Sequence, residues 1–389
     1  MVLSSVRFMR QQRFCRCRKR YKNAHHNTYS TEAALITPLD EAKRFMVDCF
    51  VAVKTSQDNA QIIADNLVEA DFRGHYSHGM NRLDMYIRDI QHGTTDPNAK
   101  PEIEKQTAAT VLVNGHNGMG AVVGKKCMEF AIDKARETGV GVVVAHSSNH
   151  YGIAGIYAQQ AIKVGLIGMS FTNTSPLMTP TRAKQATLGT NPMALGAPAL
   201  NGDYFLLDMA TTGAALGKIE LAKRKQQPLP IGWALNDEGK PETNAEIAYN
   251  AMQLMPLGGT ELNSGYKGYG LSMLVEVLCG MLSGSAYGPN IRKWGKSDKI
   301  ANLGQCFIAI DPKVFAPGFE QRMTDLMGYI RKLSPVDPKL PVLVHGDPER
   351  NHMNKVCQEG GLRYVENQHK TNAKLADQLK ITPMVSKSC

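Results

Sequence analysis

The sequence predicts an α/β protein in which a sheet-containing middle lies between two helical ends. Apolar residues recur at helical spacing from residue 38 to residue 93. Short apolar runs then alternate with helical segments over 110–310, a pattern typical of α/β folds. Helical spacing returns after residue 319, with one short strand expected at 362–365. The apolar fraction of 43% and the charged fraction of 21% are those of an ordinary globular protein, which excludes a disordered or collagen-like chain.

We divide the 389 residues into a leader and two lobes on this basis. A basic leader covers residues 1–31, and a helical lobe covers 32–105. An α/β lobe, which carries most of the candidate functional residues, covers 106–314. The C-terminal segment 315–389 is expected to pack with the helical lobe.

Cap residues define three helices in the N-terminal lobe. Thr37-Pro38 begins the first, because Thr caps a helix well and Pro suits its first position. Residues 55–58 begin the second, which stops at Gly74. The third covers 81–91 and ends before Gly93.

In the middle of the chain, strands and helices are expected in turn. The expected strands are 111–113, 140–145, 166–171, 205–207 and 306–310, with a strand pair over 231–241. The expected helices are 121–137, 153–163 and 267–283. The last helix is almost wholly apolar and is predicted to be buried. Its apolar run, 271–281, is interrupted by Glu276 and is too short to cross a bilayer, so no membrane association is expected.

The positive charge of the chain is concentrated in its leader. The formal net charge is +10, and residues 1–31 hold eight basic residues and no acid. An Arg-rich, Ser-containing, acid-free start is typical of a mitochondrial transit peptide. We therefore expect delivery to the mitochondrial matrix. The alternative is a cytoplasmic protein with a basic tail.

The rest of the chain offers neither a nucleic-acid footprint nor a metal site. It holds 37 basic and 35 acidic residues, a net charge of +2, whereas a nucleic-acid binder needs a basic face on the fold itself. Its six cysteines are far apart and form no CxxC pair, so neither a disulfide framework nor a zinc site is predicted. His146 and His150 have no acid or cysteine nearby in the sequence to complete a metal site.

One glycine-rich turn lies where a Rossmann fold would have its nucleotide-binding motif. Residues 115–120 follow a strand and begin a helix, but they read G-x-x-G-x-G instead of G-x-G-x-x-G. The next strand ends at Ala145-His146, without the acid that would hold a ribose. A tight strand-to-helix turn is the preferred interpretation.

Residues 74–82 form a candidate anion-binding corner between two helices. Gly79 permits a sharp turn into the third helix, whose free N–H groups attract a carboxylate. Arg82 can grip a carboxylate with two parallel hydrogen bonds, and Tyr86 lies on the same helix face. Ser77 places a hydroxyl beside His78. The alternative is a connecting loop whose Ser and His cap helix ends.

Polar turns follow several predicted strands of the α/β lobe. His150 lies in the turn 147–152 and is the best-placed general base, because imidazole titrates near neutral pH. Further polar turns cover 172–176, 188–192 and 208–212. Each could be a simple helix cap, but several such turns at strand ends in one lobe favour a binding site. Lys267, among the glycines of 265–270, offers a charge for a phosphate, although no P-loop motif is present.

Taken together, these motifs strongly resemble the malate/L-lactate dehydrogenase family, which is distinct from the Rossmann-type dehydrogenases. The resemblance covers residues 38 to 366. The motifs that carry it, in order, are Ser77-His-Gly with Arg82, Ser148-Asn-His-Tyr-Gly152, Asn173-Thr-Ser-Pro176, Leu188-Gly-Thr-Asn-Pro192, Asp208-Met-Ala-Thr-Thr212, Leu229-Pro-Ile-Gly-Trp233 and Lys267-Gly-Tyr-Gly270.

The resemblance implies an NAD(P)-dependent oxidoreductase of small 2-hydroxy acids, a family-specific, non-Rossmann cofactor-binding fold and a homodimer. It implies that His150 is the acid/base residue, with His78 as the alternative, and that Ser77, His78 and Asp208 form a relay. It implies substrate binding by Arg82, Tyr86, Thr190 and Asn191. It implies cofactor binding by Thr174, Ser175, Pro176, Asp208, Met209, Ala210, Lys267, Gly268, Gly346, Asp347 and Glu349.

Several choices stay open at this point. A reductase of cyclic 2-imino acids on the same scaffold is one alternative, and a non-catalytic binding descendant is another. NAD is the expected coenzyme, with NADP not excluded. The run Lys223–Lys225 could bind a 2′-phosphate, but it also suits a solvated helix end. Among the 2-hydroxy acids, a malate- or L-lactate-type substrate is expected.

Overall fold

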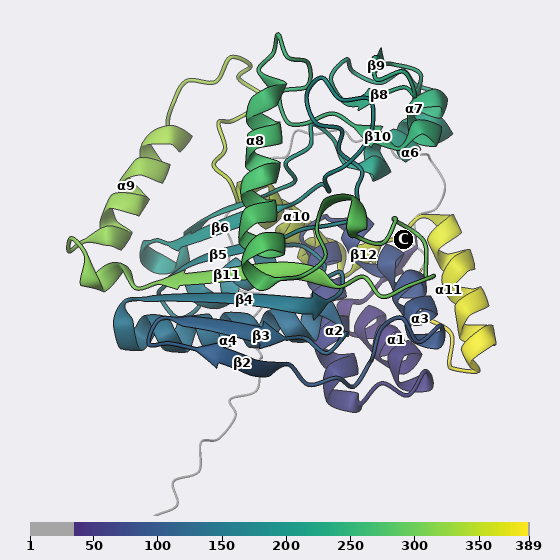
Figure 1. Cartoon of the computed structure of the whole chain (residues 1–389), viewed down its shortest axis with the longest axis horizontal. Coiled ribbons are helices and arrows are strands. Elements are labelled where there is room, and N and C mark those ends of the chain that lie inside the picture. Colours follow the sequence, from purple (N-terminus) through teal and green to yellow (C-terminus); the bar gives the residue numbers. More distant parts are fainter. Residues whose placement is uncertain (1–34, 388–389) are drawn as a thin grey trace, which may run out of the picture.

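The computed structural model describes residues 35–387 (Figure 1). The predicted transit segment, residues 1–31, lies outside the described residues. Among residues 35–387, no helix is both long enough and apolar enough to span a membrane.

A mixed seven-stranded sheet forms the centre of the molecule. Its strands lie in the order β2-β3-β4-β11-β5-β6-β7. Their bounds are β2 Glu102–Gln106, β3 Thr110–Asn114, β4 Val140–Ser148, β5 Ile167–Thr172, β6 Met193–Pro198, β7 Tyr204–Met209 and β11 Leu303–Ile310. Only β3 and β4 pair in parallel, and the other pairs are antiparallel. A doubly wound dinucleotide fold has a mostly parallel sheet, so the non-Rossmann α/β prediction is confirmed.

Two strands of this sheet were not predicted. β2 is exposed along its whole length and carries alternating charges, which suits a sheet edge but hides the apolar period of a strand. β6 contains Gly196 and Pro198, residues that usually weaken a strand. It forms because β5 and β7 pair with it on both sides.

Helices cover both faces of the sheet (Figure 1). α4 (Gly120–Thr138) and α5 (Gly155–Ile162) pack a buried apolar layer on one face. α8 (Gly265–Glu276), continued by a π-helical turn over Val277–Met281, meets the other face through Val275 and Cys279. The predicted helix over 267–283 is confirmed, but its complete burial is wrong, because five large apolar side chains of α8 and the turns after it are exposed.

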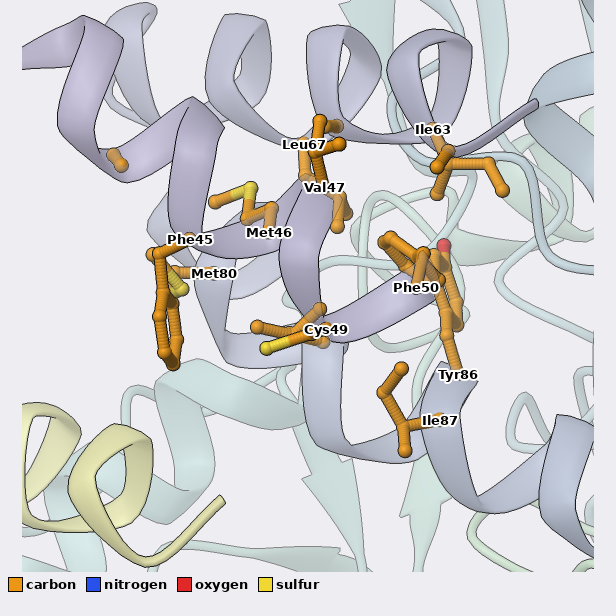
Figure 2. Close-up of a cluster of buried hydrophobic side chains, with 14 of the residues drawn as sticks. Phe45, Met46, Val47, Cys49, Phe50, Ile63, Leu67, Met80, Tyr86 and Ile87 are labelled. Carbon is orange, nitrogen blue, oxygen red and sulfur yellow. The ribbon is translucent and has the colours of Figure 1, made fainter. Parts of the chain in front are cut away.

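The N-terminal helices and the C-terminal segment share one core (Figure 2). The elements of this core are α1 Leu39–Ala52, α2 Gln57–Phe72, α3 Leu83–Gln91, α10 Asp347–Glu359 and α11 Glu366–Leu379, together with the strand pair β1 Ile36–Thr37 and β12 Leu362–Arg363. The 3₁₀ turns η1 (Tyr76–His78) and η2 (Met80–Arg82) connect α2 to α3. Phe45, Phe50 and Leu67, on α1 and α2, are fully buried in this core, which also contains Met80 and Tyr86 from the turns and helix that carry the corner residues.

Two regions lie apart from this core. α9 (Phe319–Arg331) packs on Ala199, Phe205 and Val344 beside the sheet, and in Figure 1 it stands away from the N-terminal helices. A small subdomain contains α6 Leu216–Arg224, α7 Ala245–Ala251 and the sheet β10-β8-β9, with bounds Gln253–Leu254, Ala234–Leu235 and Pro241–Glu242. The predicted strand pair over 231–241 is thereby confirmed. The short 3₁₀ turns are η3 Leu200–Gly202, η5 Gly288–Asn290 and η6 Pro312–Val314. The proposed lobe boundaries stay a prediction, although β2 already joins the sheet before residue 106.

Candidate active site

A buried carboxyl group fixes the turn that enters α3. The Asp71 Oδ2 atom accepts hydrogen bonds from Met80 N at 2.9 Å and from the Tyr364 hydroxyl at 2.7 Å. A Cβ atom on Gly79 would lie 1.9 Å from Asp71 Oδ1, so only glycine fits there. Burial raises the pKa of Asp71 to about 7, against the lowering effect of its two donors. The turn that the sequence predicted at Gly79 is thus held from α2 and from the C-terminal segment.

Arg82 presents hydrogen-bond donors that the protein does not use. Its Nε atom donates to the Ser77 carbonyl oxygen. Its terminal nitrogens have no acceptor among residues 35–387, and the guanidinium carbon lies 5.1 Å from the ring centre of Trp294. Burial lowers the pKa of Arg82, but an arginine stays charged. A half-buried guanidinium with unfilled donors is suited to a ligand carboxylate.

Two histidines stack beside Arg82. The rings of His78 and His150 are 5.6 Å apart, at an interplanar angle of 25°. His78 Nδ1 bonds to the Ser77 hydroxyl at 2.9 Å, and His150 Nδ1 bonds to the Tyr86 hydroxyl at 2.6 Å. Each imidazole therefore has its Nδ1 atom engaged by a hydroxyl, which leaves Nε2 available for chemistry.

Both imidazoles are held in the neutral form. Burial, followed by the positive charges of Arg82 and His75, lowers the pKa of His78 to about 3. Burial, His78 and Arg82 likewise lower the pKa of His150 well below its usual value. A neutral imidazole near Arg82 can take a proton from a bound hydroxyl group.

The polar turns at the strand ends meet one another through direct hydrogen bonds. Thr190 N donates to Thr174 Oγ1 at 2.9 Å, and Thr211 donates to the Thr190 carbonyl oxygen through both its N–H and its hydroxyl. Leu257 N continues this chain of contacts by donating to Thr211 O. Gly268 at the start of α8 packs on the Leu257 backbone, where a Cβ would come within 2.3 Å of the carbonyl oxygen. These contacts connect the turn of Thr174 with the turn of Lys267 and Gly268, both of which are predicted to bind the cofactor.

Glu276 is a buried carboxylate whose role the sequence did not reveal. It accepts hydrogen bonds from Asn191 Nδ2 at 2.8 Å, Asn173 Nδ2 at 3.3 Å and Gly288 N at 2.7 Å. Asn191 Oδ1 in turn accepts from Thr174 N at 3.1 Å. The sequence showed Glu276 only as an interruption of an apolar run, and the bonds that it makes are all long-range.

Asn191 consequently has its partners within the protein, whereas the resemblance implied a contact with the substrate. Its side chain is fully buried, and both its amide and its carbonyl are engaged within the protein. Asn191 therefore holds Thr174 from within the protein, and its predicted contact with the substrate stays a prediction. Thr190 is half-buried, and its hydroxyl lies 3.3 Å from that of Thr174.

Asp208 also differs from its predicted role in a relay. Its Oδ2 atom accepts from Gly155 N at 2.7 Å, at the start of α5. Burial raises its pKa, against the effects of His75 and Gly155. The charged groups that act on the pKa of His78 are Arg82 and His75, not Asp208. The carboxylate caps a helix start, and the relay from Ser77 through His78 does not extend to it in this structure.

The segment after Val344 is held by arginines. Asp347 pairs with Arg331 at 2.8 Å and also with Arg350, and it accepts from Val344 N. These bonds engage the Asp347 carboxylate within the protein, and its predicted contact with the cofactor stays a prediction. Glu349 lies 3.7 Å from His75, and Gly346 adopts a left-handed φ of 100° before α10.

A pocket joins the histidine corner to the cofactor turns. His150, Thr174, Ser175 and Trp294 line it together. Pro176 follows Ser175 in the same half-buried turn, Met209 ends β7, and Ala210 comes directly after it, both in half-buried positions. Trp294 is the second functional residue that sequence reasoning missed, because nothing near it in the chain carries a motif.

Comparison with known proteins assigns the chain to a family. The family model described as malate/L-lactate dehydrogenase matches residues 37–371. A malate dehydrogenase of Pyrococcus abyssi is 40% identical over 82% of this chain and 88% of its own length.

Solved structures agree with this assignment. The structure of malate dehydrogenase from Pyrococcus horikoshii has a TM-score of 0.83 and 35% identity, and the match covers 92% of this chain and 99% of that one. A delta1-piperideine-2-carboxylate reductase from Pseudomonas syringae has a TM-score of 0.78 and 27% identity, over 88% of this chain and 99% of its own. The chain therefore belongs to the malate/L-lactate dehydrogenase family and is a 2-hydroxy acid dehydrogenase that depends on a nicotinamide cofactor.

Proposed function

We propose that this enzyme interconverts malate and oxaloacetate with NAD as its coenzyme. The observation that carries this proposal is that His150, Thr174 and Ser175 line one pocket together, close to the unfilled donors of Arg82. The relatives named malate dehydrogenase support malate as the substrate.

Arg82 orients the substrate. Its two terminal nitrogens match the two oxygens of the C1 carboxylate, and the bond from Nε to Ser77 O holds the guanidinium plane in place. The neighbouring imidazoles then face the C2 hydroxyl group.

His150 handles the proton. With its Nδ1 proton donated to the Tyr86 oxygen, Nε2 is free to accept the proton of the C2 hydroxyl group. Once Nε2 holds this proton the ring is an imidazolium, and the same Nε2–H returns the proton to the C2 oxygen in the reverse reaction, which leaves the ring neutral again. The Tyr86 oxygen can accept from Nδ1–H in both directions and so keeps the ring in place.

The residues present fit a nicotinamide dinucleotide. The hydroxyls of Thr174, Ser175 and Thr190 suit ribose and amide groups, and exposed Lys267 at the N-terminus of α8 suits a phosphate. When bound, the nicotinamide ring accepts the hydride from C2. Lys223 pairs with Glu246 at 3.3 Å and Arg224 pairs with Glu220, so the basic run considered for a 2′-phosphate is already engaged in part. This favours NAD over NADP.

The test is a steady-state assay of the purified enzyme. We expect the kcat/KM for NADH to exceed that for NADPH, and oxaloacetate to be the best substrate in a panel with pyruvate and other 2-oxo acids. A preference for NADPH, or for a different acid, would reject that part of the proposal.

A second candidate is the reduction of cyclic 2-imino acids. The Pseudomonas syringae reductase, whose title names delta1-piperideine-2-carboxylate, supports it. Arg82 and the neutral histidines would bind and protonate such a substrate by the same chemistry. Adding this imino acid to the assay panel decides between the two, since the better kcat/KM identifies the reaction.

We also propose that the enzyme is a homodimer that uses the exposed face of α8. Five apolar side chains recur there at helical spacing and are 41–55% exposed: Met273, Leu274, Val277, Met281 and Leu282. An apolar stripe of this kind suits a second copy of the chain. Light scattering of the wild type should give the mass of a dimer, and Leu274→Glu should give a monomer. A monomeric wild type would reject the proposal.

The location is proposed as mitochondrial, with the leader 1–31 as the import signal. A fluorescent fusion of the full chain should enter mitochondria, and a fusion beginning at Glu32 should not. A cytoplasmic distribution of the full-chain fusion would favour the basic-tail alternative.

A further inference from the structure

We propose that Trp294 determines substrate specificity by closing the substrate pocket above Arg82 and His150, so that only small groups fit on C3 of the 2-oxo acid. This inference rests on the proposed function of the same site. None of the sequence motifs that carry the family resemblance includes this residue. It reaches the site only through the fold.

Trp294 touches both groups that contact the substrate. Its ring centre is 5.1 Å from the Arg82 guanidinium carbon and 5.8 Å from the centre of the His150 ring, tilted by 58°. The same half-buried indole lines the pocket with Thr174 and Ser175. A ring in this position restricts the space next to the carboxylate-binding nitrogens and the proton-transfer nitrogen.

The segment that carries Trp294 is anchored on both sides of it. Arg292 pairs with Asp89 Oδ2 at 2.8 Å, and the Ser297 hydroxyl donates to Asp89 Oδ1 at 2.6 Å. The pair is shielded from solvent, with exposed side-chain fractions of 12% for Arg292 and 8% for Asp89. Arg292 also donates to Thr94 Oγ1 and to Lys299 O. Trp294 therefore sits at the tip of a loop whose two sides meet at one carboxylate.

Helix α3 connects this anchor to the catalytic groups. Asp89 lies three residues after Tyr86, so both project from one face of α3. Tyr86 bonds to His150, and Asp89 holds the loop that places Trp294 against the same imidazole. Helix α3 thus positions the His150 ring through Tyr86 and the Trp294 ring through Asp89. Asp89 is therefore a positioning residue.

The first experiment compares substrates of increasing C3 size. We expect Trp294→Ala to raise kcat/KM for phenylpyruvate relative to pyruvate by about tenfold or more, because a pocket discriminates by roughly this factor for each added group. The KM for NADH should stay unchanged. Trp294→Phe should give an intermediate ratio. An equal loss for all substrates, or an unchanged ratio, would overturn the proposal.

A binding measurement separates this proposal from the proposed reaction. The chain has two tryptophans, and Trp233 packs with Lys218 in the small subdomain, so Trp233→Phe leaves Trp294 as the sole emitter. We expect the tryptophan emission of this variant to change on titration with malate at a fixed concentration of NADH, a pair of reduced compounds that cannot react. If the emission changes while no 2-oxo acid is reduced, the proposed function fails and the location of Trp294 in the binding pocket stands. If turnover occurs without any change in emission, the Trp294 proposal fails.

The anchor has a matched control away from the pocket. Asp89→Asn should relax the phenylpyruvate-to-pyruvate ratio in the same direction as Trp294→Ala, by a smaller factor, with the KM for NADH unchanged. Asp133→Asn removes the acid of an exposed pair with Arg136 on α4 and should leave the ratio as in the wild type. Equal behaviour of the two variants would remove Asp89 from the positioning role.

Discussion

The substrate corner and the Glu276 junction use similar polar groups in opposite ways. In the corner, formed by Ser77–Tyr86 with His150, the terminal nitrogens of Arg82 have no acceptor in the described part of the chain. In the junction, Glu276 accepts from Asn173, Asn191 and Gly288. The corner keeps hydrogen-bond donors free for a ligand, whereas the donors and acceptors of the junction bond to one another inside the protein.

This difference distinguishes polar turns that bind a ligand from polar turns that stabilise the protein itself. A buried polar group that is fully paired makes a fold specific and rigid, and one that keeps unfilled donors costs stability unless a ligand fills them. Polar turns look alike in sequence. Asn191 nevertheless holds Thr174 by a hydrogen bond, whereas the free donors of Arg82 are suited to a ligand carboxylate. Variants in the two regions should therefore change different quantities.

The largest effect is expected at His150 in the corner. His150→Ala should lower kcat by about 10²–10⁴-fold, the usual contribution of a general acid or base, with little change in the free energy of unfolding. The measurement is kcat for oxaloacetate reduction, together with the same variant at His78. A smaller loss at His150 than at His78 would transfer the acid/base role to His78.

The second-largest effect is expected in the junction, on the free energy of unfolding. Glu276→Ala leaves three buried donors without their acceptor and should lower the free energy of unfolding by about 3 kcal/mol or more, at roughly 1–3 kcal/mol for each donor. Urea unfolding measures this change. Glu261→Ala is the control, because it removes an exposed partner of Arg182 and should change stability by less than about 0.5 kcal/mol. Equal stabilities of the two variants would contradict the role of the junction.

A smaller effect is expected when the charge of Arg82 is kept. Arg82→Lys loses the paired geometry and the contact with the Trp294 ring, so the KM for oxaloacetate should rise about tenfold, which corresponds to ~1.4 kcal/mol. The KM for NADH should not change. Unaltered substrate kinetics would show that a point charge is sufficient at this position.

The smallest effect concerns the dependence of stability on pH. In the folded state the pKa of His78 is lowered to about 3 and that of His150 is also lowered, while the unfolded rings titrate near 6.5. Below pH 6.5 the unfolded rings bind more protons than the folded ones, so the contribution of each ring lowers the free energy of unfolding with falling pH, by less than about 1 kcal/mol between pH 7 and 6. Asp71, whose folded-state pKa is raised to about 7, acts in the opposite direction over this range. A double variant, His78→Gln with His150→Gln, should therefore lose less stability than the wild type over this range in urea unfolding.

Local sequence patterns determined much of the fold and the contiguous part of the site. The cap at Ser56, which accepts from Asn59 N, and the apolar spacing of α1 and α2 are local signals, and both helices formed. The predicted cap by Thr37 is wrong, because Thr37 lies in β1 with its hydroxyl bonded to Ser386, and Pro38 precedes α1 without a side-chain cap. The corner over 77–86 was recognisable because its residues are neighbours in the chain. Strand β6 was missed because its pairing with β5 and β7 overrides the unfavourable Gly196 and Pro198.

Only the tertiary structure decided which polar residues serve the site and which support it. The sequence around Asp208 is compatible with two roles, orienting a histidine or capping α5. Only the fold places its carboxylate against Gly155 N. Glu276 and Trp294 come from segments remote in sequence from the residues that they contact, so no local spacing could predict their partners. The sequence by itself determined the α/β class, the helical ends and the chemistry available, because these follow from local periodicity and residue type. Burial, hydrogen-bond partners and the shape of the pocket depend on long-range packing, which the chain settles only when it folds.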